Sequence, residues 1–130
     1  MSIGAEQIRV RISNAFGLTD LPITKATIAY PVASGGYNKL AVSDPINFPI
    51  APESVISITL YLANGQTTNS ITSHPGSRTG SWISSGDQTA SRNFTGPSTV
   101  ESFHWYFLSA VEAWSPRAAG AFVIVGDSIT

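Results

Sequence analysis

The stretch Val55–Leu62, with the sequence VISITLYL, carries the clearest structural pattern in the chain. Its even-numbered residues are all large and aliphatic: Ile56, Ile58, Leu60 and Leu62. Polar or aromatic residues lie between them, apart from the valine that opens the stretch. Because successive side chains of a β-strand point to opposite faces, this alternation predicts a strand with one apolar face.

Further strands are predicted on both sides of this stretch. Gln7–Ser13 alternates apolar residues with Arg9 and Arg11, whose side chains we expect on a solvated surface. The other predicted strands are Ile23–Tyr30, Leu40–Val42, Ile46–Ile50, Thr67–Thr72, Gly80–Ile83 and Phe103–Trp114. Turn residues separate them at intervals of about ten residues, and no stretch has a helical period. The sequence therefore predicts an all-β fold, an antiparallel β-sandwich or jelly-roll-like domain.

Single residues refine this prediction. Pro49 has no backbone N–H to donate, which favours an edge position for Ile46–Ile50. Ser84–Thr99 is polar and rich in Gly and Ser, so we expect a long surface loop. Trp105 and Trp114 lie in an apolar strand and are expected in the core or in a contact between domains.

The composition limits the classes of function. The 130 residues have a net charge of −1 and only 12% are charged, whereas nucleic-acid binding requires a basic surface. The lack of cysteine excludes disulfides and thiol nucleophiles, and no His or carboxylate spacing fits a metal, so no metal or other cofactor is expected. No apolar run approaches the roughly 20 residues of a membrane span. A surface rich in Ser, Thr, Asn and Gln suits a secreted, extracellular protein and sugar ligands, although Met1–Gly4 is not a signal peptide.

The stretch Ala121–Thr130, AFVIVGDSIT, differs from everything before it. Its five apolar residues predict a fully buried strand, and Gly126, Asp127 and Ser128 predict a tight turn at the end of that strand. Open α/β sheets carry their chemistry at this position. We therefore expect a sandwich domain over residues 1–114, a linker over 115–120, and the first strand and turn of an α/β domain over 121–130.

Several stretches resemble one family of enzymes. Val125–Thr130 resembles the first motif block of SGNH (GDSL-type) hydrolases. The upstream sequence resembles the β-sandwich domain that precedes the hydrolase domain in a fungal and bacterial subgroup of these esterases. The stretches that carry this resemblance are Gln7–Gly17, Ser43–Pro45, Leu60–Leu62, Ser73–Thr79 and Phe107–Glu112.

The resemblance implies specific roles for the terminal turn. Ser128 would be the nucleophile and its backbone N–H would help to bind the oxyanion, while Gly126 and Asp127 would shape the turn. The family's other blocks supply a glycine, an asparagine and a late Asp-x-x-His, and this sequence contains none of them. We therefore expect a truncated esterase whose catalytic domain is missing and which is inactive alone.

Candidate binding residues lie upstream. His74 and Arg78, on a Pro- and Gly-containing loop, either bind a sugar or acyl substrate or are fixed by local hydrogen bonds. Trp82 is a candidate platform for stacking a sugar. His104 is expected to be structural, and Asn93 opens an Asn-Phe-Thr glycosylation acceptor.

Three functions stay open at this point. The first is an accessory β-sandwich domain of a secreted SGNH-type serine esterase, acting on esters such as those of carbohydrates. The second is a carbohydrate-binding module or lectin-like protein. The third is a self-assembling β-protein in which Ala121–Val125 adds as a strand to another copy.

Overall fold

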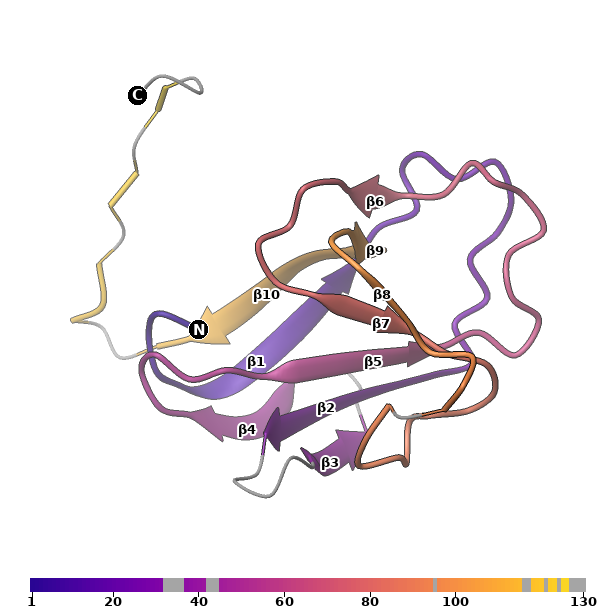
Figure 1. Cartoon of the computed structure of the whole chain (residues 1–130). Helices are drawn as coiled ribbons and strands as arrows, with labels where there is room; N and C mark the ends of the chain where they lie inside the picture. Colours follow the sequence, from indigo (N-terminus) through magenta and orange to yellow (C-terminus); the bar gives the residue numbers. More distant parts are fainter. Residues whose placement is uncertain are drawn as a thin grey trace.

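The computed structural model describes residues 1–31, 37–41, 45–94, 96–115, 118–120, 122–123 and 125–126. Within these ranges the chain forms β-strands that pair antiparallel, and no helix is present among them. The predicted all-β fold is therefore confirmed. Figure 1 shows the strands arranged around a common interior.

Two three-stranded sheets form the body of the molecule. The first has the order β10-β1-β4 and the second has the order β3-β2-β5. The strands of the first sheet are β10 (Leu108–Trp114), β1 (Ala5–Ile12) and β4 (Ile46–Ile50). The strands of the second are β3 (Tyr37–Ala41), β2 (Lys25–Pro31) and β5 (Ser57–Tyr61). β4 lies at the edge of its sheet, as Pro49 predicted.

The hydrophobic core draws on both sheets, which makes the fold β-sandwich-like. Ile8 of β1 and Ile28 of β2 have no exposed surface. The rings of Tyr30 and Phe48, from β2 and β4, stack with their centroids 4.3 Å apart. The other buried members of this cluster are Ala5, Ile46 and Ile50. The apolar residues Val10 of β1 and Ile58 of β5 pack against this cluster, as the alternation of these two strands predicted.

Two short ribbons complete the fold. β6 (Ser73–His74) pairs with β9 (Trp105–Tyr106), and β7 (Ser81–Ile83) pairs with β8 (Val100–Ser102). The predicted strand Thr67–Thr72 is wrong, since no strand lies between the end of β5 at Tyr61 and the start of β6 at Ser73. Its polar side chains close local turns instead, and the Thr68 hydroxyl accepts a hydrogen bond from the Ser70 N–H at 3.1 Å.

The predicted strand Phe103–Trp114 is broken at Phe107. This residue has a φ of 62°, a left-handed conformation that separates β9 from β10. Of the two placements expected for Trp105 and Trp114, the one in the core is wrong, because these side chains are 42% and 44% exposed. β9 leaves the main sheet to pair with β6, and the ring of Trp114 lies 5.6 Å from the Arg9 guanidinium on the outer face of β1 and β10.

Glu112 joins Arg9 and Arg11 on that outer face. Its carboxylate accepts a hydrogen bond from Arg9 Nε at 2.8 Å and one from Arg11 Nη1 at 3.2 Å. The hydrogen bond from Arg9 is the main cause that lowers the pKa of Glu112. The two arginines thus lie on the solvated face that the alternation predicted, where they share one acid.

The apolar segment after β10 is not buried. Phe122, Val123 and Val125 are 89%, 76% and 92% exposed, and none of them belongs to a strand. Figure 1 shows this part of the chain extending away from the sheets. The described residues of the predicted strand are therefore exposed and unpaired with any described strand, whereas Ala121 and Ile124 lie outside the described residues.

Candidate functional site

Most candidate binding residues lie on one irregular ribbon, in which residues 73–83 run against residues 100–106. At one end His74 is paired with Trp105, and at the other Trp82 is paired with Glu101. Between these ends, the Ser77 N–H donates to the Phe103 carbonyl at 2.8 Å. Residues 75–80 outnumber the residues opposite them, so they bulge outward as a loop.

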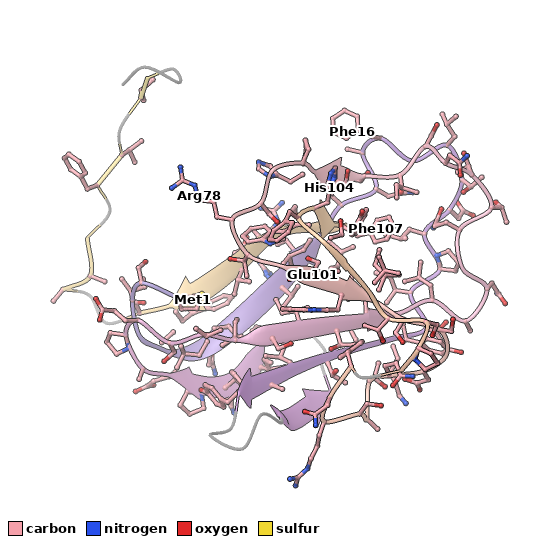
Figure 2. All side chains as sticks on the ribbon, in the orientation of Figure 1. Met1, Phe16, Arg78, Glu101, His104 and Phe107 are labelled. Carbon is pink, nitrogen blue, oxygen red and sulfur yellow. The ribbon has the colours of Figure 1, made fainter. Side chains whose placement is uncertain are left out.

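Local hydrogen bonds fix this loop. Gly76 has a φ of 68°, which a side chain would disfavour. Ser77 is buried, and its hydroxyl donates to the Thr79 carbonyl at 2.8 Å. Arg78, between them, is exposed and extends away from the sheets in Figure 2. The loop is therefore held in place by Ser77, and it exposes the positively charged side chain of Arg78.

The two histidines have different surroundings. His74 is exposed, and its ring is tilted against Trp105 with the centroids 6.4 Å apart. His104 is half-buried, stacked on Tyr106 at 5.9 Å, with its Nδ1 3.5 Å from the Ser73 hydroxyl. Among the described residues, neither histidine forms an ion pair with a carboxylate. The packing of His104 agrees with the structural role expected for it.

Trp82 and Glu101 form the best-defined pair on the ribbon. Trp82 is 50% exposed, and Glu101, which sequence reasoning missed, stands directly opposite it. Both side chains converge above Gly80: a Cβ at that position would lie 2.6 Å from Glu101 Oε1 and 3.4 Å from Cη2 and Cζ2 of Trp82. Because Gly80 has no side chain, the edge of the indole and the carboxylate can both occupy the space next to its Cα. Knowledge of the pairing between β7 and β8 would have been needed to find Glu101.

The residues to which the hydrolase resemblance gave roles lie at the C-terminal end of the chain. Gly126 is exposed, whereas Asp127 and Ser128 lie outside the described residues. Asn93 is exposed, and Thr95 of its glycosylation acceptor lies outside them too. Within the described ranges, no three His, Cys, Asp or Glu side chains are placed to hold a metal ion. In the same ranges no helix has the length and apolar character that crossing a bilayer requires.

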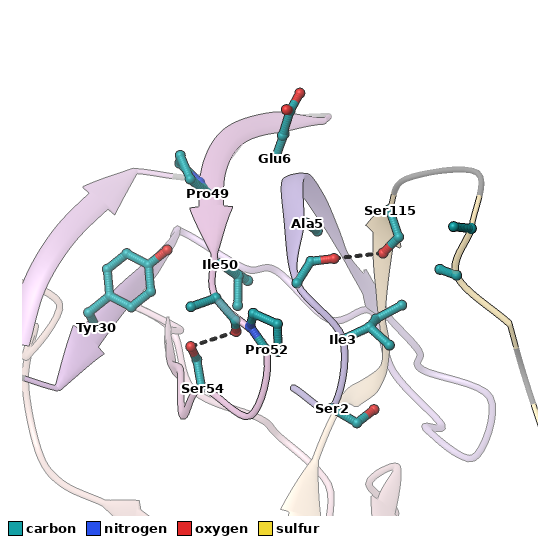
Figure 3. Close-up of a pocket in the computed structure, with 14 residues that line it drawn as sticks. Ser2, Ile3, Ala5, Glu6, Tyr30, Pro49, Ile50, Pro52, Ser54 and Ser115 are labelled. Atoms are coloured by element: carbon teal, nitrogen blue, oxygen red, sulfur yellow. Dashed lines mark hydrogen bonds between the residues drawn. The ribbon is translucent and has the colours of Figure 1, made fainter.

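An open groove of about 1060 Å³ lies at the other end of the sandwich (Figure 3). Its walls are mostly apolar and include Ile3, Ile50 and Pro52. Tyr30 also lines it, and the buried hydroxyl of this residue has no hydrogen-bond partner among the described residues; burial raises the pKa of this hydroxyl. The Ser115 hydroxyl donates to the Gly4 carbonyl at 2.7 Å, which holds the start of the C-terminal segment at the rim.

No protein-family model matches the chain, and no curated protein matches it in sequence. The resemblance to SGNH hydrolases therefore rests on the motifs in the sequence alone.

Proposed function

We propose that this chain is the β-sandwich accessory domain of a secreted serine esterase of the SGNH type. The observation that carries the proposal is the exposure of Phe122, Val123 and Val125, directly before Gly126 and the predicted nucleophile Ser128. Burial of one such side chain contributes roughly 1.5–3 kcal/mol. A segment of this composition is stable when strands pair with it on both sides, as in the parallel sheet of an α/β hydrolase domain.

The chemistry proposed for the complete enzyme is ester hydrolysis through an acyl-enzyme. The Ser128 oxygen attacks the ester carbonyl while a base takes its proton, the alcohol leaves, and water then releases the acid. His74 and His104 are poor candidates for that base, because neither has a carboxylate partner in the described chain to orient it. The base is therefore assigned to a domain beyond the sandwich, and carbohydrate esters are the substrate class that the weakly charged surface suits.

Sequencing of the transcript beyond the codon for Thr130 tests this proposal. The expected result is a reading frame that continues into a glycine block, an asparagine block and an Asp-x-x-His motif. A stop codon at this point, or a continuation without these motifs, would overturn the proposal.

Hydrolysis of a short-chain p-nitrophenyl ester gives a second test. The purified chain and its Ser128→Ala variant are expected to show the same background rate, because a serine hydroxyl without a base is a weak nucleophile. Turnover that depends on Ser128 would contradict the assignment of the base to another domain.

A further inference from the structure

We propose that the irregular ribbon binds a carbohydrate through Trp82 and Glu101. The indole would stack on the C–H face of one sugar ring, and the carboxylate would accept hydrogen bonds from its hydroxyls. This binding needs neither Ser128 nor a catalytic domain, so it stands independently of the esterase proposal.

The register of the ribbon supports this pairing. Trp82 and Glu101 are directly opposite in an antiparallel pair, where the two side chains project from the same face within contact distance. Gly80 lies two residues before Trp82 and therefore on that same face. Because Gly80 has no side chain, the indole edge and the carboxylate both reach the space above it.

Both groups are available to a ligand. Half of the Trp82 surface is exposed, although a tryptophan is usually mostly buried in a folded protein. Glu101 is exposed, and no hydrogen bond or ion pair engages its carboxylate within the described part of the chain. Glu112 provides a contrast, because Arg9 and Arg11 occupy its carboxylate beside Trp114.

The chemistry of the pair favours a neutral polyol. A phosphate-bearing ligand would be repelled by Glu101, and an acyl chain would leave the carboxylate desolvated without a partner. A sugar satisfies both groups, since its ring has apolar C–H faces and its hydroxyls donate hydrogen bonds. An organic cation could also contact a ring and a carboxylate, but ion pairs on an open surface contribute little.

The test is titration of the full chain with neutral mono- and oligosaccharides, followed by NMR of the indole N–H groups. We expect the Trp82 resonance to shift with a Kd on the order of 1 mM, a weak affinity that suits one small, exposed site. Trp82→Ala is expected to weaken binding at least tenfold. Glu101→Gln is expected to weaken it several-fold, because the amide keeps one oxygen acceptor.

Matched variants keep the test decisive. Trp114→Ala removes a tryptophan of similar exposure whose neighbouring acid is already paired, and it should leave the Kd unchanged. Gly80→Ala keeps both ligand groups but displaces them, and it should weaken binding while circular dichroism shows an unchanged fold. The proposal is overturned if no sugar shifts the Trp82 resonance, if Trp82→Ala binds as the wild type does, or if tetramethylammonium binds and sugars do not.

Discussion

The sandwich and the irregular ribbon use the same residue types in opposite ways. Ile28 in β2 has no exposed surface, whereas Ile83 in β7 is 50% exposed. The difference arises because β2 faces a second sheet across the core, while β7 and β8 form a ribbon of only two strands. Burial in the sandwich therefore stabilises the molecule, and exposure on the ribbon leaves side chains available to a ligand.

The ribbon depends on the sandwich for its position, because a two-stranded ribbon is marginally stable alone. Its anchor is Phe107, where β9 ends. The Phe107 carbonyl accepts a hydrogen bond from the Ser13 N–H at 2.8 Å, and its N–H donates to the Thr72 carbonyl at 3.0 Å. These two bonds hold a residue whose left-handed backbone is otherwise unfavourable. The irregular ribbon is therefore joined to the sandwich at Phe107, a residue with a strained backbone.

The largest predicted effect compares the same substitution in the two regions. Ile28→Ala should lower the free energy of unfolding by about 2–5 kcal/mol, because it leaves a cavity in the core. Ile83→Ala should lower it by less than about 1 kcal/mol, because water already reaches that side chain. Urea denaturation followed by circular dichroism measures both. Equal losses would show that the ribbon is part of the core.

The second prediction compares valines that are exposed in different places. We expect the chain to self-associate through the segment around Val123, which is 76% exposed and does not belong to a strand. Val123→Asp should raise the dissociation constant at least tenfold, about 1.4 kcal/mol. Val100→Asp changes a valine of the ribbon that is 61% exposed, and it should have little effect. Sedimentation velocity measures the association, and a reversed order would place the interface on the ribbon.

Hydrophobic alternation was enough to predict the sandwich. It located β1, β2 and β5, and Pro49 correctly placed β4 at an edge. These features follow from local chemistry, namely the period of two in a strand and the missing donor of proline. The loop Ser84–Thr99 was also predictable from its polar composition, and no strand lies in its described residues.

The ribbon was only partly predictable. Trp82, His74 and Arg78 were identified from residue type and turn signals, but Glu101 was missed because its partner lies across the long loop that joins β7 and β8. Nothing about a phenylalanine predicts a left-handed backbone, so the break at Phe107 was not foreseen. Without that break, Trp105 was assigned to a continuous apolar strand and expected in the core or in a contact between domains. The pairing of Glu101, the break at Phe107 and the exposure of Trp105 all depend on which strands pair and in which register. Local sequence patterns do not determine that register.

The third prediction compares the strained residues of the two regions. Glu53, in the turn after β4, has a φ of 59° and an exposed side chain. Glu53→Gly should stabilise the protein by about 0.5–1 kcal/mol, since relief of the left-handed conformation exceeds the entropy cost of glycine. Phe107→Gly should instead destabilise it by about 1–2 kcal/mol, because the half-buried ring is lost. Thermal denaturation measures both, and Glu53→Ala, which should give no gain, is the control.

The smallest predicted effect concerns the loop between β7 and β8, which an ion pair ties to the sandwich. Lys25 Nζ on β2 lies 2.9 Å from Asp87 Oδ2. Asp87 Oδ1 accepts hydrogen bonds from the hydroxyl and, at 2.9 Å, from the backbone N–H of Thr89, whose side chain is buried. The hydroxyl of Thr89 and then Lys25 are the main causes that lower the pKa of Asp87 to about 2.

The direction of the pH dependence follows from that lowered pKa. The folded state favours the ionised carboxylate, so Asp87 adds stability above its ordinary pKa of 3.8, and this contribution is lost as the pH falls from about 4 to about 2. Asp87→Asn should remove this part of the slope in a plot of melting temperature against pH. Thr89→Val removes the largest cause of the lowered pKa and should shift the midpoint of the loss to higher pH. Since the carboxylate is exposed, the change should be small. An unchanged slope in Asp87→Asn would show that the loop is held to β2 by packing around Thr89 and not by charge.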